Sequence, residues 1–256
     1  MHRAYSLTGI DNSFYNNFMK WHDEKDFALN TKGKSISILK SVLRWAESFT
    51  KVNTEYRDFR KHSETVYQVY QSIDELQKFY KKKLPQRLER IRDLHILRSF
   101  LGIRIGDGIE KDAIYTEKGK SFIRIITKKT GSIVVIPIHK VVKEILMKYK
   151  YNIPKISDAK YNEYIKEAAE ESKINQWITQ VRTIGGVRKE SKKKKHQLIT
   201  THTARRSFAT NMFLAGVPIK SISILLGHAT VKTTENYIKV TQEDNARLLS
   251  EHAFFK

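Results

Sequence analysis

The chain of 256 residues contains no cysteine. This absence excludes a disulfide framework, zinc sites built from thiolates and a cysteine nucleophile. The sequence also has no run of about 18 apolar residues, so it predicts no membrane-spanning helix. The opening residues, MHRAYSLTGIDNSFY, lack the apolar stretch and the small-residue cleavage site of a signal peptide. We therefore expect an intracellular, cytoplasmic protein.

Acidic residues are few relative to basic ones. Aspartate and glutamate number 27 against 48 lysines and arginines, which gives a net charge of +21. Such an excess points to a polyanionic partner. No basic amphipathic anchor stands out, so nucleic acid is expected before an anionic membrane. A ribosomal-type or merely soluble basic protein is the alternative that charge alone leaves open.

The N-terminal part of the sequence predicts two amphipathic helices. The apolar residues that recur at helical spacing are Phe14, Phe18 and Trp21 in the first, and Ile36, Leu39, Leu43 and Ala46 in the second. Basic residues among the polar positions suit a small helical module that lies on a phosphate backbone. A helical hairpin packing only on its own protein would have the same spacing. Residues 50–70 lose the periodicity and are expected to connect two domains.

A capping-box pattern, Ser72 with Glu75, places the domain boundary close to residue 71. The sequence thus predicts a helical domain with its linker over residues 1–70 and a second domain over residues 71–256. In the second domain a helix should end at Gly102. The stretch FIRIITKKTGSIVVIPI contains two β-rich runs around KKTG, which indicates a hairpin. The expected fold class is mainly α with a small β-sheet (α+β).

The basic stretch RTIGGVRKESKKKKHQ follows a further helical segment. Its lysine run, Lys192–Lys195, is expected to be a solvated loop rather than a specific reader of a ligand.

Two stretches near the C-terminus hold the residues that carry chemistry, THTARRSFAT (201–210) and LLGHATVKTTENYI (225–238). A helix should begin at about Thr201, with His202 and Arg205 on neighbouring positions of its first turns. Because a helix N-terminus favours an anion, two cationic side chains there indicate a phosphate between them. The alternative is that His202 caps the helix and Arg205 is a surface arginine.

A second helix should end at Gly227, a residue that can adopt the left-handed conformation. His228 is then positioned by a helix end. Tyr237 follows on a new short helix, and its sequence neighbours are polar, unlike those of a typical core tyrosine.

These motifs resemble those of the tyrosine recombinase (phage integrase) family. HTARRSFATN resembles the H-x-x-R box, and LLGHATVKTTENYIKV resembles the L-G-H box with the nucleophilic tyrosine. FLGIRIGD resembles the box of the first arginine, and TKKTGSIVVIPI resembles the hairpin of the active-site lysine. The resemblance covers roughly residues 70–250, and the N-terminal helices look like the core-binding domain of the family. It implies that residues 1–70 form a core-binding (DNA-binding) domain and that residues 71–256 form the catalytic domain. One departure is Leu101, where a threonine is more usual. A looser resemblance is to integrases of Bacteroidetes mobile elements.

The resemblance implies a catalytic set made of Arg104, Lys129, His202, Arg205, His228 and Tyr237. Tyr237 would be the nucleophile, His202 the base and Lys129 the acid, while the two arginines and His228 would hold the scissile phosphate. No cofactor is expected, because the sequence has no Walker-type glycine loop. No metal is expected either, because no carboxylate cluster is present to hold Mg²⁺.

The implied function is site-specific cleavage and rejoining of double-stranded DNA through a 3′-phosphotyrosine, for integration or excision of a mobile element or phage. The resemblance further implies a homotetramer on two DNA sites in which the apolar C-terminal tail is exchanged between protomers. A type IB topoisomerase and a non-catalytic DNA-binding protein on a recombinase scaffold are the alternatives. The extra arm-binding domain that integrases of mobile elements often carry is not recognised, which leaves a fragment and a simpler family member both open.

Overall fold

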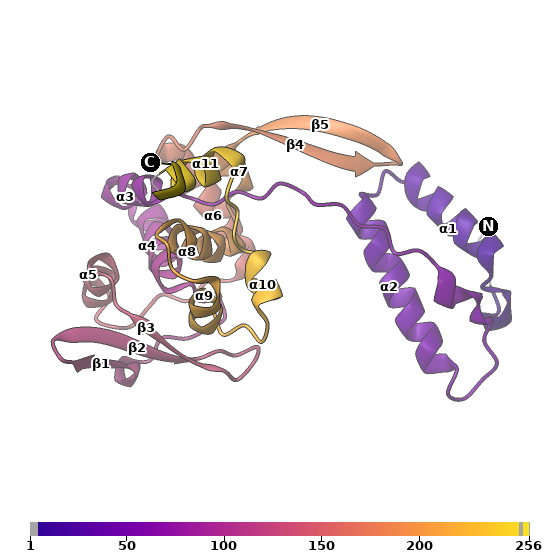
Figure 1. Cartoon of the computed structure of the whole chain (residues 1–256), viewed down its shortest axis with the longest axis horizontal. Helices are drawn as coiled ribbons and strands as arrows, with labels where there is room; N and C mark the ends of the chain where they lie inside the picture. The colour runs from indigo at the N-terminus through magenta and orange to yellow at the C-terminus, as the bar shows by residue number, and fades with distance from the viewer. Residues whose placement is uncertain (1–4, 251–252, 256) are drawn as a thin grey trace. The chain divides into compact units, whose positions relative to one another are not determined.

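The computed structural model describes residues 5–250 and 253–255. Helices dominate it, and the strands form one three-stranded and one two-stranded antiparallel arrangement (Figure 1). The mainly helical fold with a small β-sheet that the sequence predicts is therefore confirmed. Within the described residues, no helix combines the length and apolar character needed to cross a bilayer.

The chain divides into two compact units, Met1–Tyr67 with Ile178–Lys193, and Gln68–Trp177 with Lys194–Lys256. The first break lies close to the boundary expected at residue 71. The second unit is interrupted, because a segment from late in the sequence belongs to the first unit.

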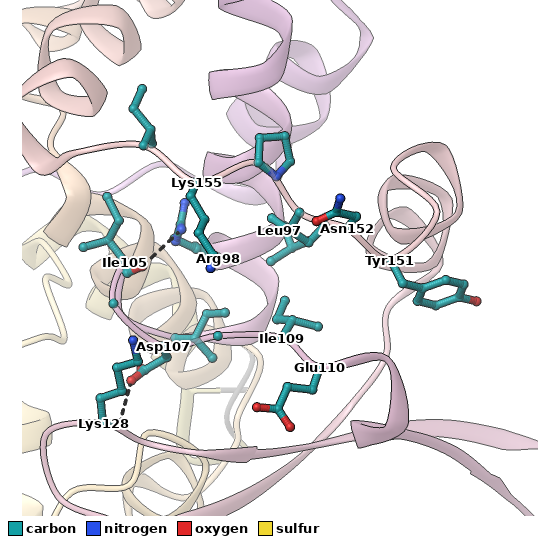
Figure 2. A pocket seen from close by; sticks show the side chains of 16 residues that line it. Leu97, Arg98, Ile105, Asp107, Ile109, Glu110, Lys128, Tyr151, Asn152 and Lys155 are labelled. Atoms are coloured by element: carbon teal, nitrogen blue, oxygen red, sulfur yellow. Dashed lines mark hydrogen bonds between the residues drawn. The ribbon is translucent and has the colours of Figure 1, made fainter.

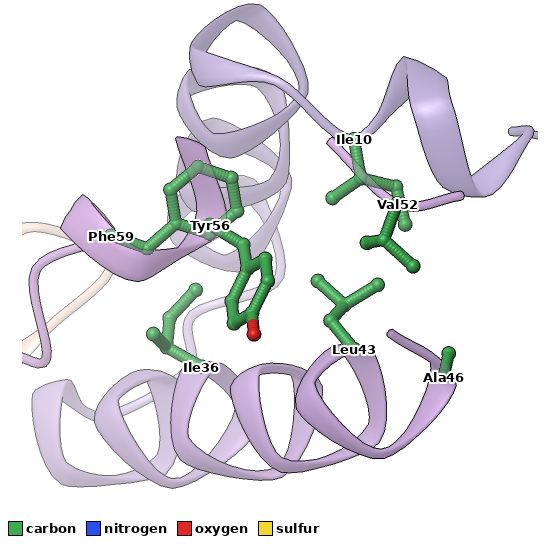
Figure 3. Close-up of a cluster of buried hydrophobic side chains, with 7 residues drawn as sticks. All are labelled: Ile10, Ile36, Leu43, Ala46, Val52, Tyr56 and Phe59. Atoms are coloured by element: carbon green, nitrogen blue, oxygen red, sulfur yellow. The ribbon is translucent and has the colours of Figure 1, made fainter. Parts of the chain in front are cut away.

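The first unit contains two helices, two short 3₁₀ helices and most of a β-hairpin. These are Leu7–Gly9, α1 (Asn12–Glu24), α2 (Leu29–Ala46), Thr54–Asp58, β4 (Trp177–Ile184) and β5 (Val187–Lys194). Both predicted helices are present. Phe14 and Phe18 of α1 pack on a core in which Ile36 and Leu43 of α2 meet Tyr56 and Phe59 of the following segment (Figure 3). Trp21, the third residue of the stripe predicted for the first helix, is 46% exposed and does not belong to this core.

The second unit contains the remaining elements. These are α3 (Ile73–Lys81), α4 (Gln86–Leu101), the 3₁₀ helix Lys111–Ala113, β1 (Ile114–Glu117), β2 (Lys120–Ile126), β3 (Ile133–Pro137), α5 (Lys140–Lys148), α6 (Asp158–Glu171), α7 (Lys195–Leu198), α8 (Thr201–Leu214), α9 (Ile219–Leu225), α10 (Val231–Glu235), α11 (Gln242–Ser250) and the 3₁₀ helix Ala253–Phe255. Helix α4 is central, because it packs against α3, α5, α6 and α8. The predicted capping box is present at the start of α3, where Ser72 and Glu75 bond each other's backbone amides.

Gly102 ends α4 in the left-handed conformation, with a φ of 64°. A Cβ atom there would lie 2.5 Å from Cδ1 of Phe208 on α8, so both the backbone angle and the packing require glycine. The predicted helix stop is confirmed. This close approach brings the end of α4, and the loop that carries Arg104, against α8.

A buried hydrogen-bond network holds α8 and α6 on α4. His95 bonds the Gln71 side-chain oxygen through Nε2 at 2.6 Å and the Tyr161 hydroxyl through Nδ1 at 2.9 Å. The Gln71 backbone amide donates to the Ser207 hydroxyl on α8 at 2.9 Å. Complete burial lowers the pKa of His95 to about 3, so this histidine is neutral and supports the fold.

The sheet of the second unit is a meander in the order β1-β2-β3. Strands β2 and β3 pair from Phe122 opposite Pro137 to Ile126 opposite Ile133, and Gly131 has a φ of 65° in the turn between them. The hairpin predicted around KKTG is confirmed, and it presents Lys128 and Lys129 at its turn.

The prediction of a solvated loop for Lys192–Lys195 is wrong. Gly185 and Gly186 form the turn of the β4–β5 hairpin, and Lys192, Lys193 and Lys194 lie on β5. Lys195 begins α7 and is buried, and its ammonium pairs with both oxygens of Glu75 at 2.6 and 2.7 Å. The strand was missed because β5 buries neither face and so lacks apolar alternation.

Candidate active site

Helix α8 positions two of the expected side chains. It begins at Thr201, as predicted, and the Thr200 backbone amide donates to the Thr203 hydroxyl at 2.9 Å. His202 on the first turn is exposed, whereas Arg205 is only 2% exposed. Arg205 is therefore not a surface arginine, and that alternative is wrong.

Two helix C-termini hold the Arg205 guanidinium in place. Its Nη1 donates to the Gly102 carbonyl at the end of α4, and its Nη2 donates to the Leu226 carbonyl at the end of α9, both at 2.5 Å. The negative ends of these helix dipoles stabilise the buried cation. Burial and the neighbouring Arg104 lower the pKa of Arg205 to about 10, which still leaves it charged at neutral pH. Its Nε is buried without a hydrogen-bond partner among the described residues.

His228 follows Gly227, which ends α9 with a φ of 61° as predicted. Its Nε2 lies 2.7 Å from Nη2 of Arg205, and its Nδ1 lies 2.9 Å from the Thr234 hydroxyl. A guanidinium can only donate, so Nε2 must be the accepting nitrogen and Nδ1 the protonated one. Burial and the positive charges of Arg205 and Arg104 lower the pKa of His228 to about 4, which agrees with a neutral ring.

Tyr237 lies against these two residues. Its ring centroid is 5.4 Å from the guanidinium carbon of Arg205 and 5.2 Å from the centre of the His228 ring. The expectation that Tyr237 lies on a short helix is wrong, because α10 ends at Glu235. The backbone after α10 is nevertheless tied down, since the Tyr237 amide donates to the Thr234 carbonyl at 2.8 Å.

Asp107 joins the Arg104 loop to the lysine hairpin. Its buried carboxylate accepts from the Lys128 backbone amide at 3.0 Å (Figure 2). The same carboxylate accepts from the Arg104 backbone amide at 2.8 Å. Asp107 is the last residue of the FLGIRIGD motif, and its bridge to the hairpin depends on the tertiary structure. Nη1 of Arg104 is buried and has no hydrogen-bond partner in the part of the chain that the structure describes.

A pocket of about 570 Å³ brings most of the predicted set together. The predicted residues that line it are Arg104, Lys129, His202, Arg205 and Tyr237. His228 does not line this pocket but contacts Arg205. Lys128 lines the pocket beside Lys129, and both side chains are exposed, so geometry alone does not choose between the two lysines.

The pocket also contains three residues that sequence reasoning missed, namely Asp158, Thr201 and Thr233. Asp158 begins α6, far from the motifs in sequence, and no local pattern marks it. Thr201 and Thr233 stand inside the quoted motifs, where their hydroxyls give no distinct signal. Among residues 5–250 and 253–255, no group of three or more histidine, aspartate or glutamate side chains could hold a metal ion.

The electrostatics of the pocket suit a base as well as an anion. His202 is exposed at its surface but partly desolvated by its surroundings, and this desolvation, followed by the positive charges of Arg206 and Arg205, lowers its pKa below the usual 6.5. His202 is therefore mostly neutral at pH 7 and can accept a proton. The guanidinium groups of Arg104 and Arg205, which both line the pocket, add fixed positive charge that favours an anion there.

Residues 68–244 match the model of the phage integrase family. The chain belongs to this family. The site described above lies wholly within the matched residues.

Three of the curated relatives that this chain matches are named as tyrosine recombinases. XerC of Rickettsia rickettsii is 25% identical over 231 residues, which cover 84% of this chain and 71% of the relative. XerD of Listeria monocytogenes is 32% identical over 148 residues, which cover 55% and 47%. XerA of Pyrococcus furiosus is 42% identical over 60 residues, which cover 23% and 21%. The chain thus spans less than half the length of several curated relatives that it matches.

Solved structures show the same fold at low sequence identity. The XerH recombinase in a post-cleavage complex with its palindromic difH substrate has a TM-score of 0.68 at 16% identity, covering 98% of this chain and 73% of that one. A lambda integrase (75–356) dimer on a COC′ core site has a TM-score of 0.64 at 19% identity, covering 92% and 82%. The fold of this member of the phage integrase family is that of the tyrosine recombinases.

Proposed function

We propose that this protein is a site-specific tyrosine recombinase that cuts and rejoins double-stranded DNA through a 3′-phosphotyrosine at Tyr237. The observation that carries the proposal is the pocket that Tyr237 lines together with Arg104, Arg205 and His202. Membership of the phage integrase family and the net charge of +21 support it. Integration or excision of a mobile element or phage is the biological reaction that we propose for it.

The chemistry requires groups of these types. A phosphodiester carries one negative charge, and nucleophilic attack raises the charge on its non-bridging oxygens. Arg104 and Arg205 present fixed guanidinium donors for these oxygens, which stabilise the five-coordinate transition state. Arg205 is preorganised for this role, because its two bonds to helix ends hold it in place before DNA binds.

Proton transfers complete the cleavage step. The Tyr237 hydroxyl forms a bond to phosphorus while the bond from phosphorus to the 5′ oxygen breaks. A free tyrosine has a pKa of about 10, so its proton must leave at neutral pH, and neutral His202 accepts it. Lys129 gives a proton to the departing 5′ oxygen. Attack by a 5′ hydroxyl on the phosphotyrosine reverses each transfer and reseals the strand.

His228 is assigned a positioning role in this proposal. Its neutral Nε2 accepts from Arg205, so in this tautomer it orients the guanidinium rather than donating to the phosphate. A direct bond from His228 to the scissile phosphate, which the resemblance implies, would require a proton on Nε2.

The pH dependence of cleavage tests the assignment of His202. Because its pKa lies below 6.5, the base form persists to lower pH than for a free histidine. We expect a single-turnover cleavage rate that is level from pH 8 to about 6.5 and falls only at lower pH. The measurement is adduct formation over a pH series in wild type and His202→Gln. If the cleavage rate of His202→Gln falls at low pH over the same range as that of wild type, a group other than His202 is responsible for the fall.

The direct test of the function is a covalent adduct on a nicked suicide substrate whose cleaved end diffuses away. A 3′-linked adduct that resists SDS is expected. A type IB topoisomerase would relax supercoiled plasmid without a defined site, whereas a recombinase cleaves only a duplex that contains its target. A non-catalytic DNA-binding protein would retain the duplex and form no adduct.

The two units have separate roles in this proposal. The unit formed by Met1–Tyr67 and Ile178–Lys193 serves as the core-binding domain, and the unit that contains the pocket serves as the catalytic domain. The protein is proposed to act as a homotetramer on two DNA sites. A solved lambda integrase tetramer on a Holliday junction, with a TM-score of 0.61, supports this assembly.

The C-terminal tail is proposed to dock on a neighbouring protomer. Helix α11 buries none of its residues, and Leu249, Phe254 and Phe255 are 41%, 83% and 62% exposed. The Tyr70 hydroxyl donates to Asp244 at 3.0 Å, which ties the first turn of α11 to its own domain. An exposed apolar end of this kind is typical of an interaction site.

Deletion of residues 243–256 should therefore leave a folded, DNA-binding monomer that forms no higher-order complexes and recombines poorly. Native gels and a recombination assay measure this. Phe255→Ser keeps the Asp244 contact and should show the same defect in weaker form. Normal synaptic complexes from the truncated chain would refute exchange of the tail between protomers. Unfolding of the truncated chain would indicate that the tail docks on its own protomer.

A further inference from the structure

The β4–β5 hairpin contains a strand with an unusual charge. Five of the eight residues of β5 are basic, namely Arg188, Lys189, Lys192, Lys193 and Lys194, against one acid, Glu190. The seven residues from Val187 to Lys193 are all exposed. A strand in a folded domain normally covers a core with at least one face. Packing therefore does not explain why this strand is present.

The hairpin is nevertheless firmly anchored at its tip within the first unit. The Thr183 amide and hydroxyl both donate to Glu64 at 2.8 Å, and Ile184 forms a β-bridge with Ala28. Gly185 has a φ of 58°, and a Cβ atom there would lie 2.6 Å from Oδ1 of Asp26. The hairpin is thus held at its tip rather than free in solvent.

The charges of the hairpin are balanced only at this tip. Lys189 pairs with Asp26 at 3.4 Å. Arg188, Lys192 and Lys193 have no ion pair or side-chain hydrogen bond among the residues that the structure describes. Exposed basic side chains without an acidic partner attract a polyanion.

We propose that the β4–β5 hairpin is an auxiliary surface that binds the sugar–phosphate backbone of duplex DNA through Arg188, Lys192 and Lys193. The inference rests on the proposed function, which makes duplex DNA the substrate. A two-stranded ribbon has the width that a major groove admits. Two of the three cations are lysines, which act as point charges toward phosphate and carry little base specificity. The surface therefore adds affinity without adding sequence preference.

The test compares two triple variants with the same loss of charge. Arg188→Gln/Lys192→Gln/Lys193→Gln removes the proposed contacts, and Lys140→Gln/Lys143→Gln/Lys150→Gln removes three exposed lysines in and just after α5. Affinity for a duplex is measured by fluorescence anisotropy from 50 to 200 mM salt. Losing three phosphate contacts should lower the slope of log affinity against log salt by about 2.7. Raising the salt fourfold should therefore weaken DNA binding by the hairpin variant by a factor that is about 40 times smaller than the factor for wild type.

The control variant should keep a slope close to that of wild type. Equal slopes for the two variants would overturn the inference and leave the hairpin lysines as a solvated face. Equal melting temperatures of the two variants establish that the difference does not reflect unfolding, since all six side chains are exposed.

Failure of the proposed function gives a different result. The hairpin variant at saturating protein and 50 mM salt should still form the covalent adduct, because the catalytic pocket is untouched. If wild type forms no adduct while the slopes differ as stated, the recombinase assignment fails and the DNA surface stands. If adducts form and the slopes do not differ, the DNA surface alone fails.

Discussion

Replacing Tyr237 by phenylalanine should abolish the covalent protein–DNA adduct while DNA binding persists. The substitution removes only the phenolic oxygen, and the ring can keep its packing against Arg205 and His228. The backbone bond from Tyr237 to Thr234 is also unaffected. The measurement is the fraction of a suicide substrate that remains attached to protein after SDS treatment, alongside anisotropy for binding.

A matched control is Tyr164→Phe, which removes the same atom from a tyrosine on α6 whose ring contacts Arg87. This variant should form the adduct at the wild-type rate. An SDS-resistant adduct from Tyr237→Phe would mean that another side chain is the nucleophile.

Arg104→Ala should slow cleavage by about 10²–10³ under single-turnover conditions, equivalent to ~3–4 kcal/mol of transition-state stabilisation. The Arg104 backbone amide bonds Asp107, and this bond survives the substitution. Its Nη1 has no partner among the described residues, so the change should cost little stability. Binding should stay within several-fold of wild type, because many other basic residues share the phosphate contacts. Wild-type cleavage by this variant would remove Arg104 from the site.

A substitution other than alanine is needed to test the role of Arg205 in cleavage. Arg205→Ala would leave the Gly102 and Leu226 carbonyls without their donor, so lost activity could reflect lost structure. Arg205→Lys keeps a buried cation but loses the planar fork, and cleavage should fall by a similar 10²–10³. A melting temperature near that of wild type for Arg205→Lys, with cleavage reduced, assigns the loss to chemistry. Unchanged cleavage would show that the fork is dispensable.

The prediction of a solvated loop at Lys192–Lys195 was wrong for a physical reason. Sequence patterns detect a strand through the alternation that a buried face imposes, and β5 has no buried face. The prediction failed at Lys195 for another reason. The Lys195 ammonium pairs with Glu75, which lies 120 residues earlier in the chain. Neither fact leaves a local pattern.

The sequence by itself determined the features that depend on neighbouring residues. The capping box at Ser72, the left-handed glycines Gly102 and Gly227 and the start of α8 at Thr201 all follow from short-range rules of backbone geometry. The order of the recombinase motifs is also a property of the sequence alone.

Only the tertiary structure decided how these pieces act on one another. Arg205 bonds a carbonyl 103 residues away, and Asp107 bonds an amide 21 residues away. The first bond holds Arg205 in the interior, and the second ties the lysine hairpin to the Arg104 loop. The contact between Arg205 and His228 determines which nitrogen of His228 carries the proton. The β4–β5 hairpin likewise belongs to a unit that its sequence position does not predict. The physical reason is that burial and hydrogen bonding depend on distance in space, which local sequence patterns do not encode.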